Sequence, residues 1–155
     1  MILVYSYYVL DILHRGHIEM IRNAKAAAGK DGLLIVGILT DDATREKKPS
    51  PILSFEERIS VARSIRYVDM VVAQDTYSPL KNVLDIKPDI LMESTSHEED
   101  IEVTEAMKSI KGRIIKVPYF PDHSSTNIKE QINESQNVNT VVHGVDTCRL
   151  CGDRI

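Results

Sequence analysis

The sequence predicts an α/β fold of the Rossmann-like type, a three-layer αβα sandwich around a five-stranded, mostly parallel sheet. Short apolar segments rich in β-branched residues alternate with segments whose apolar residues recur at helical spacing. This repeated strand, helix, strand order favours parallel strands covered on both faces and joined by right-handed crossovers. The 155 residues, 43% of them hydrophobic, suit one compact domain, which we place at residues 1–135 with a tail at 136–155.

The first two predicted strands flank a helix and lead into a loop. Residues 2–8 are apolar, aromatic and partly β-branched, as expected of a buried strand. Residues 16–28 carry apolar side chains at helical spacing, and residues 33–39 (LLIVGIL) indicate a second buried strand. Residues 40–54 are polar and contain two prolines, so we expect a loop there.

A capping box predicts the start of the next helix. Ser54 is the candidate N-cap, and Glu57 follows at the spacing that lets the two residues satisfy two backbone N–H groups reciprocally. We expect three further elements after this helix, namely a strand at 68–73, a short helix at 80–86 and a strand at 89–92.

The last third of the chain repeats the pattern. A helix of mixed charge is expected at residues 98–110 and a fifth strand at 113–117. After a proline turn at 118–121, a last helix is expected at 124–134. Asn, Gln, Ser and Val dominate the stretch up to Asn139, which we interpret as a linker.

An anion site is predicted where the first strand hands over to the first helix. Asp11, His14, Gly16 and His17 all lie in this short junction. Unpaired backbone N–H groups and the positive end of the helix dipole favour an anion there, and a glycine lets the backbone approach it closely. Two imidazoles beside that anion could donate hydrogen bonds to phosphoryl oxygens as negative charge builds up.

Other polar groups are predicted at the same edge of the sheet. Lys47 and Lys48 follow the second strand, and residues 124–126 begin the helix after the fifth strand. Ligands of parallel sheets bind at the carboxyl ends of the strands. The convergence of these segments therefore predicts a phosphate-binding site.

Three motifs, taken in order along the chain, resemble those of one known superfamily. They are Asp11-x-x-His14-x-Gly16-His17, Arg66-Tyr67-Val68-Asp69 and Ser124-Ser125-Thr126. On these motifs, residues 2–132 resemble the cytidylyltransferases of the HxGH nucleotidyltransferase superfamily. Among its subgroups, the chain is similar to glycerol-3-phosphate cytidylyltransferase and to the cytidylyltransferase domains associated with phosphonate biosynthesis.

The resemblance implies transfer of CMP from CTP to a small phosphate- or phosphonate-bearing alcohol, with release of pyrophosphate. It also implies a requirement for Mg²⁺, carried by the nucleotide rather than by a protein metal site. By matching positions, the implied catalytic residues are His14, His17, Lys47 and Lys48. The implied nucleotide-binding residues are Tyr8, Val9, Asp11, Gly16, Arg66, Ser124, Ser125 and Thr126.

The chain departs from the family pattern at three places. Residues 8–11 (YVLD) stand where relatives often have Gly-Thr-Phe-Asp, and residues 93–96 (ESTS) replace a Gly-Asp-Asp type of motif. An arginine often found before the Ser/Thr motif is missing, with Tyr119 or Phe120 in its place and His123 close by. We therefore expect an altered acceptor pocket that includes Tyr119 and His123.

Two other functions are compatible with the same motifs. One is an ATP-dependent adenylyltransferase of the same superfamily, and the other is a nucleotide-binding module without turnover. Single residues have alternatives as well. Asp11 could cap the turn, orient a histidine or contact a ligand or metal, and Arg66 could pair with Glu57 or Asp69 instead of a nucleotide.

Composition restricts the partners and the location of the protein. The formal charge of −4 and the absence of a basic stripe argue against a nucleic-acid binder. No apolar run approaches the ~18 to 20 residues that span a bilayer, and the N-terminus lacks the pattern of a signal peptide. We therefore expect a cytoplasmic protein that does not contact membranes.

The sequence also allows expectations about the two cysteines and the oligomeric state. Cys148 and Cys151 lie at the end of the chain, so no disulfide framework holds the fold together. The pair could be half of a zinc site, with only His143 nearby, or a redox pair, but we expect neither role. The family resemblance also implies a homodimer.

Overall fold

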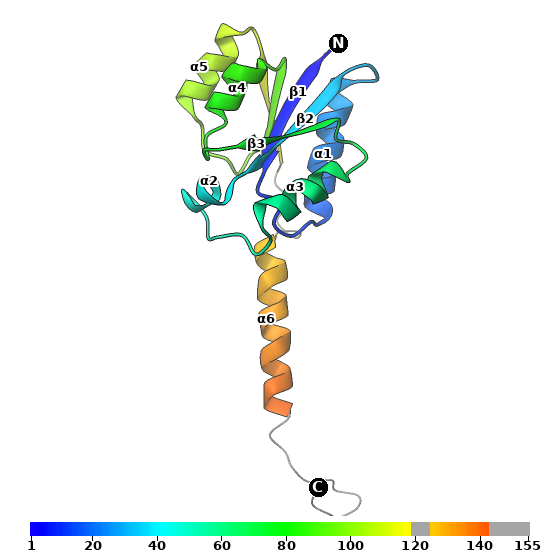
Figure 1. Cartoon of the computed structure of the whole chain (residues 1–155), viewed down its shortest axis with the longest axis vertical. Coiled ribbons are helices and arrows are strands. Elements are labelled where there is room, and N and C mark those ends of the chain that lie inside the picture. Colours follow the sequence, from blue (N-terminus) through cyan, green and yellow to red (C-terminus); the bar gives the residue numbers. More distant parts are fainter. Residues whose placement is uncertain (119–124, 143–155) are drawn as a thin grey trace, which may run out of the picture.

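A parallel sheet forms the centre of the computed structural model, which describes residues 1–118 and 125–142, with side chains up to residue 135 (Figure 1). Its strands are β1 (Leu3–Tyr8), β2 (Leu33–Leu39), β3 (Met70–Gln74), β4 (Ile90–Ser94) and β5 (Arg113–Val117). Their order is β3-β2-β1-β4-β5, and each neighbouring pair is parallel. The predicted Rossmann-like α/β fold with a five-stranded sheet is therefore confirmed.

The strand order reverses at the centre of the sheet. β1 pairs with β2 on one side and with β4 on the other. β3 therefore lies beyond β2 at one edge of the sheet, and β5 lies beyond β4 at the opposite edge. In open sheets of this type, ligands bind in the crevice at the carboxyl ends of the strands, at the point of reversal. The topology alone thus directs attention to the ends of β1 and β4.

Helices cover both faces of the sheet (Figure 1). On one face, Ile21 of α1 and Ala62 of α3 belong to the same buried cluster as Val4 of β1. On the other face, Tyr5 of β1 is buried with residues of α4 and α5 such as Met107. The helices of the described residues are α1 (Arg15–Ala28), α2 (Asp41–Arg45), α3 (Phe55–Arg63), α4 (Leu80–Ile86), α5 (Ile101–Ser109) and α6 (Ser125–Val142).

The capping box at the start of α3 is confirmed. The Ser54 hydroxyl accepts from the backbone N–H of Glu57, and the Glu57 carboxylate accepts from the backbone N–H of Ser54. Most other predicted element ends agree with the structure to within three residues. Local patterning and capping were therefore sufficient to locate most of the elements.

The prediction that residues 40–54 form only a loop is wrong, because α2 lies inside this segment. Thr40 caps α2, since its hydroxyl accepts from the backbone N–H of Ala43 at 3.2 Å. Asp41, in the first turn, is bound by the buried side chain of Arg58. A tertiary contact and a good N-cap thus stabilise a helix of only one turn and a half, which has no apolar periodicity to reveal it.

The prediction of a linker up to Asn139 is also wrong, because α6 runs through that stretch to Val142. Neither glycine nor proline occurs between residues 125 and 142, so nothing in the sequence ends the helix early. The predicted domain boundary after residue 135 falls inside this helix. α6 starts beside the sheet and projects away from it (Figure 1). Within the described residues, no helix is long and apolar enough to cross a membrane.

Candidate active site

A cavity of about 490 Å³ lies at the carboxyl ends of β1 and β4, where the strand order reverses. The ends of β1 and β4, the starts of α1 and α6, and the segment after α2 all contribute to its wall. Its lining consists of Ser6, Tyr7, Tyr8, Val9, Leu10, Asp11, His14, Gly16, His17, Met20, Leu39, Thr44, Lys48, Pro49, Pro51, Tyr77, Glu93, Ser94, Ser96, His97, Ser125, Thr126 and Lys129. The predicted convergence at this edge of the sheet is present in the structure.

Two neighbouring histidines form one wall of the cavity. His14 is the N-cap residue of α1, and His17 lies in the first turn, so that their ring centroids are 3.8 Å apart. Gly16 between them is buried. Burial lowers the pKa of His17 to about 3, and the neighbouring His14 and Lys48 add to the shift. His17 is therefore neutral near pH 7, when one ring nitrogen carries a proton that it can donate and the other accepts.

His17 also has unused hydrogen-bonding capacity. Its Nδ1 atom is buried and has no hydrogen-bond partner among the residues that the structure describes. The Tyr8 ring meets the His17 ring edge-on at 6.1 Å, which fixes the orientation of the imidazole. A buried polar atom without a partner calls for an explanation, and a bound ligand would supply one.

Asp11 forms hydrogen bonds with the segments that surround the two histidines. One carboxylate oxygen accepts from the backbone N–H groups of Ile52 and Leu53, at 2.7 and 2.9 Å. The other accepts from Lys129 of α6 at 2.6 Å. Burial alone would raise the pKa of Asp11, but the charge of Lys129 and these hydrogen bonds hold it below the usual value. Asp11 thus joins the segment before α3 and the start of α6 to the end of β1.

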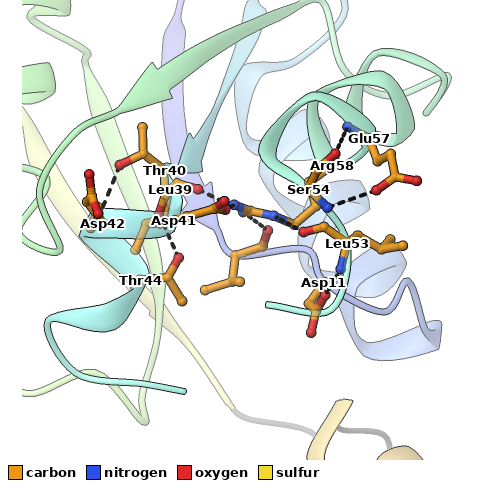
Figure 2. A network of polar contacts seen from close by, with 12 residues as sticks. Asp11, Leu39, Thr40, Asp41, Asp42, Thr44, Leu53, Ser54, Glu57 and Arg58 are labelled. Atoms are coloured by element: carbon orange, nitrogen blue, oxygen red, sulfur yellow. Dashed lines mark hydrogen bonds and ion pairs between the residues drawn. The ribbon is translucent and has the colours of Figure 1, made fainter. Parts of the chain in front are cut away.

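Arg58 organises the opposite side of the same loops (Figure 2). Its side chain is fully buried, and its Nη1 group donates to the carbonyls of Val9 and Leu39, both at 2.7 Å. Its Nε group donates to the carbonyl of Leu53 at 3.2 Å, and its Nη2 group to Asp41 at 2.5 Å. One guanidinium therefore connects the ends of β1 and β2 to the starts of α2 and α3.

Sequence reasoning missed Arg58, although a signal for its burial was available. Arg58 lies four residues before Ala62 and seven before Ile65, on the buried stripe of the helix. A single arginine on an apolar stripe indicates that the fold supplies acceptors for it, because a buried charge needs partners. Lys129 was missed for a different reason, since only the tertiary structure brings α6 to Asp11.

The two predicted lysines have different positions. Lys48 lines the cavity, and burial lowers the pKa of its ammonium group. Lys47 is not among the lining residues. Its Nζ atom lies 3.5 Å from the carboxylate of Glu98 and 5.2 Å from the centre of the Tyr77 ring. The Nζ atom of Lys48 also lies near the Tyr77 ring, 5.9 Å from its centre, so of the two lysines only Lys48 combines this position with a place in the cavity lining.

The remaining predicted residues divide into three groups. Ser125 and Thr126 line the cavity at the start of α6, and the Ser125 hydroxyl donates to the carbonyl of Ile12 at 3.2 Å. Arg66 does not line the cavity. It lies 5.1 Å from the Tyr67 ring and donates to the Tyr67 hydroxyl. The predicted residues Tyr119, His123 and Ser124, together with the pair Cys148 and Cys151, lie outside the described residues.

Neither alternative partner suggested for Arg66 is found. Asp69 accepts from Lys25 at 2.6 Å, and the Glu57 carboxylate is used in the capping box. A nucleotide contact for Arg66 stays a prediction, as do the ligand roles of the other site residues.

The far end of the cavity contains a second polar cluster, formed by Tyr7, Tyr77, Glu93 and His97, which we call the glutamate end. The Tyr7 hydroxyl lies 2.8 Å from Nδ1 of His97. Burial lowers the pKa of His97 to about 4, with Lys48, Lys116 and Lys47 adding to the shift, so this ring is neutral near pH 7. Burial also raises the pKa of Tyr7, so its hydroxyl keeps its proton near pH 7, and the tautomer of His97 decides which of the two groups donates the hydrogen bond.

Glu93 is the carboxyl member of the glutamate end. It is only 8% exposed, and its carboxylate lies 3.9 Å from Nδ1 of His97, beyond hydrogen-bond distance. Burial is the main cause that raises the pKa of Glu93, opposed by Lys116 and assisted by Asp100. The departure from the family pattern at residues 93–96 thus marked the position, but the sequence did not reveal its surroundings.

The described residues contain no group of three or more His, Cys, Asp and Glu side chains arranged to hold a metal ion. Both oxygens of Asp11, at the histidine wall, already accept hydrogen bonds from protein groups. A divalent cation at this wall would therefore take its ligands mainly from a bound phosphate chain and from water, as Mg²⁺ commonly does.

Comparison with known proteins identifies related sequences. A family model described as cytidylyltransferase-like matches residues 9–150. An FAD synthase from Korarchaeum cryptofilum (strain OPF8) is 32% identical over 126 residues, which make up 79% of this chain and 85% of that protein. The bifunctional protein HldE from Gluconobacter oxydans (strain 621H) is 32% identical over 128 residues, 81% of this chain. These cover 26% of HldE, so the chain spans about a quarter of that protein.

A solved structure shows the same architecture. The lipopolysaccharide core biosynthesis protein from Thermoplasma volcanium GSS1 matches with a TM-score of 0.67 and 26% identity. The match covers 77% of this chain and 98% of that one. The fold of this chain is therefore shared by a solved structure over most of its length.

Proposed function

Because this chain belongs to the cytidylyltransferase-like family of nucleotidyltransferases, we propose that it transfers a nucleotidyl group from a nucleoside triphosphate to a small phosphate- or phosphonate-bearing alcohol. The observation that carries the proposal is the set of hydrogen-bond donors in the cavity lining. His14, His17, Lys48, Ser125 and Thr126 all belong to it.

The chemistry requires positioning more than a covalent nucleophile. An oxygen of the acceptor phosphate or phosphonate attacks the α-phosphorus of the nucleotide, the bond from that phosphorus to the β-phosphate oxygen breaks, and pyrophosphate leaves. Negative charge spreads over the phosphoryl oxygens during the transfer. The partly buried, neutral His17 donates a hydrogen bond to that charge, and Lys48 neutralises part of it.

Mg²⁺ fits this site as a companion of the nucleotide. When bound to the triphosphate, it supplies charge neutralisation at the phosphate oxygens. The chain's own part is to receive the loaded triphosphate between the histidines and the start of α6. Ser125 and Thr126 sit at the first turn of α6, where backbone N–H groups and the helix dipole favour an anion.

CTP is the nucleotide that we propose first. It agrees with the description of the matching family and with the motifs at His14, Gly16 and His17. ATP is the second candidate, favoured by the similarity to an FAD synthase, whose named product contains adenine. The homodimer and the cytoplasmic location expected from the sequence remain part of this proposal.

The test is pyrophosphate release with each nucleotide in turn. The full chain is incubated with Mg²⁺, with CTP or ATP, and with a panel of phospho- and phosphono-alcohols. We expect release with CTP that exceeds release with ATP and that falls about 100-fold or more in His17→Ala, because a transition-state donor is lost. The matched control is Lys81→Ala, which removes an exposed side chain of α4 outside the cavity.

Two results would contradict the proposal. Binding of CTP without any product across the panel would indicate a nucleotide-binding module without turnover. Failure to bind either nucleotide, measured by calorimetry, would remove the nucleotidyltransferase function altogether.

A further inference from the structure

A buried polar network lies outside the cavity lining, beside the segment that joins β3 to α4. Tyr5 of β1 and Gln74 of β3 are 0% and 1% exposed, and the Tyr5 hydroxyl donates to Oε1 of Gln74 at 2.6 Å. Nδ2 of Asn82 in α4 donates to the same hydroxyl at 2.8 Å. Residue 37 of β2 is glycine, which leaves room for this hydroxyl, because a Cβ atom there would lie 2.1 Å from it. Buried polar groups need partners, and the members of this network supply them to one another.

The network ends at the backbone of Tyr77. Nε2 of Gln74 donates to the carbonyls of Thr76 and Tyr77, both at 3.1 Å. Residues 75–79 form neither helix nor strand, so these bonds replace those that a regular element would supply to its backbone. The backbone N–H of Tyr77 donates to the Glu46 carboxylate at 3.0 Å. Gln74 and Glu46 therefore hold the two polar groups of the Tyr77 backbone.

The ring of Tyr77 in turn meets the two lysines that follow α2. The Nζ atoms of Lys47 and Lys48 lie 5.2 and 5.9 Å from the centre of this ring, distances at which a ring face attracts an ammonium group. Lys47 is also paired with Glu98 at 3.5 Å, whereas Lys48 lines the cavity together with Tyr77. Glu46 directly precedes both lysines, so its bond to Tyr77 keeps the ring and the lysines in register.

We propose that Gln74 is a positioning residue for nucleotidyl transfer, which acts through the backbone and ring of Tyr77 on the place of Lys48 in the cavity. The inference rests on the proposed function, in which Lys48 neutralises phosphate charge. A lysine side chain loses much rotamer freedom when it is held in one place. A ring that restricts Lys48 before the nucleotide arrives therefore lowers the cost of using its charge.

A role in stability alone predicts a different result. If the network only stabilised the fold, the loss of the Gln74 amide would lower the free energy of unfolding and leave the kinetic parameters of the folded protein unchanged. If Gln74 acts on Lys48, the folded variant itself is impaired, and the impairment requires Lys48.

The experiment is a double-mutant cycle between Gln74 and Lys48, measured as kcat/KM for CTP with the full chain. Gln74→Met keeps the length of the side chain and removes its amide, so we expect kcat/KM to fall about 10-fold through displacement of Lys48. In the Lys48→Met background the same substitution has no further effect. Urea denaturation gives conditions in which all four proteins are folded. The matched control is Gln131→Met, at an exposed position of α6 that does not line the cavity.

Variants of Tyr77 test the link between Gln74 and Lys48, also where Gln74→Met does not fold. Tyr77→Leu removes the ring, so it lowers kcat/KM in the wild type and has no further effect in Lys48→Met. Tyr77→Phe keeps the ring face and restores most of that loss. Hydrogen exchange at residues 75–79 becomes faster in Gln74→Met but not in Tyr77→Leu, whose backbone keeps its hydrogen bonds.

The results that overturn the inference differ from those that overturn the proposed function. Equal losses from Gln74→Met in the wild type and in Lys48→Met, or an unchanged kcat/KM in the folded variant, would overturn the inference and leave the proposed function intact. If the wild type binds CTP without turnover, the same cycle is measured on Kd by calorimetry, and equal losses again overturn the inference. Absence of both product and nucleotide binding in the wild type removes the proposed function, and the inference with it.

Discussion

The histidine wall and the glutamate end of the same cavity are assembled in different ways. The histidine wall comes mainly from one short stretch, in which His14, Gly16 and His17 follow the end of β1 directly. The glutamate end combines Tyr7 of β1, Tyr77 from the segment before α4, and Glu93 and His97 from β4 and the residues after it. A local motif can be recognised in a sequence, whereas a cluster drawn from three segments needs the fold.

The two ends also differ in charge. Both contain a partly buried histidine whose pKa is lowered, so both offer neutral imidazole near pH 7. Among the described residues, the carboxyl of Asp11 at the histidine wall accepts hydrogen bonds from protein groups, whereas the buried carboxyl of Glu93 lies 3.9 Å from His97, beyond hydrogen-bond distance. Under the proposed function, the histidine wall is the end that we assign to the phosphates of the nucleotide, and the glutamate end has a different chemical character.

The largest effect is expected from Arg58, which supports the histidine wall from behind. Arg58→Ala leaves the carbonyls of Val9 and Leu39 without their donor and Asp41 without its partner. We expect the free energy of unfolding, measured by urea denaturation, to fall by about 3–5 kcal/mol. Arg63→Ala, on the exposed side of the same helix, serves as control. Equal stability of the two variants would show that the buried network contributes nothing.

His17→Ala is expected to have the next largest effect, and it tests whether the histidine wall acts independently of the glutamate end. The variant lowers kcat by about 100-fold, because it removes a donor to the transition state. The factor is the same for every acceptor and nucleotide pair, since the histidine wall handles the shared chemistry. Steady-state kinetics with two acceptors check this, and a factor that depends on the acceptor would mean that the two ends do not act separately.

The pH dependence of stability tests both ends at once. His17 and His97 resist protonation in the folded protein until pH values near 3 and 4, whereas in the unfolded chain they take up protons below about 6.5. Acidification from pH 7 to pH 5 therefore favours the unfolded state, by on the order of 1–2 kcal/mol for each histidine.

Denaturation curves at the two pH values measure this loss. His97→Gln removes one of the two contributions, so its stability should fall less between pH 7 and pH 5 than that of the wild type. A loss of stability unchanged by the substitution would show that His97 is not buried in its neutral form.

The smallest effect is expected from Lys129, which connects α6 to the histidine wall through Asp11. Lys129→Met breaks a partly exposed ion pair and costs about 1 kcal/mol. Hydrogen exchange in the first turns of α6 should become faster, while exchange in α1 stays the same. Glu130→Gln, at the exposed neighbouring position, is the control. Unchanged exchange in α6 would mean that this pair does not hold the helix.

The comparison also explains which parts of the site sequence reasoning could reach. His14, His17, Lys48, Ser125 and Thr126 were predicted and line the cavity, because each follows a strand and the topology brings strand ends together. Arg66 and Lys47 were predicted as well, but neither lines the cavity. Arg66 lies against the ring of Tyr67, outside the lining, and Lys47 lies over the ring of Tyr77, which is itself a lining residue.

The helices also divide into those that the sequence predicted and those that it did not. The capping box at Ser54 and Glu57 was visible because both partners lie within one helical turn. The short helix α2 was missed because its stability depends on Arg58, seventeen residues away. The extension of α6 through the predicted linker was missed because a polar composition was taken as a sign of irregular structure, although nothing in that stretch breaks a helix.

The sequence by itself determined the α/β class, the alternation of strands and helices, and the position of His14, Gly16 and His17 at the start of the helix after β1. Each of these depends on residues that are near one another in the chain, through periodicity, capping and helix N-terminal geometry. Only the tertiary structure decided that Arg58 is buried beneath three loops and that Asp11 pairs with Lys129. It also decided that Glu93 faces neutral His97 in an enclosed space. These contacts join segments that are far apart in the chain and depend on which side chains the fold buries. The spacing of residues along the sequence therefore does not predict them.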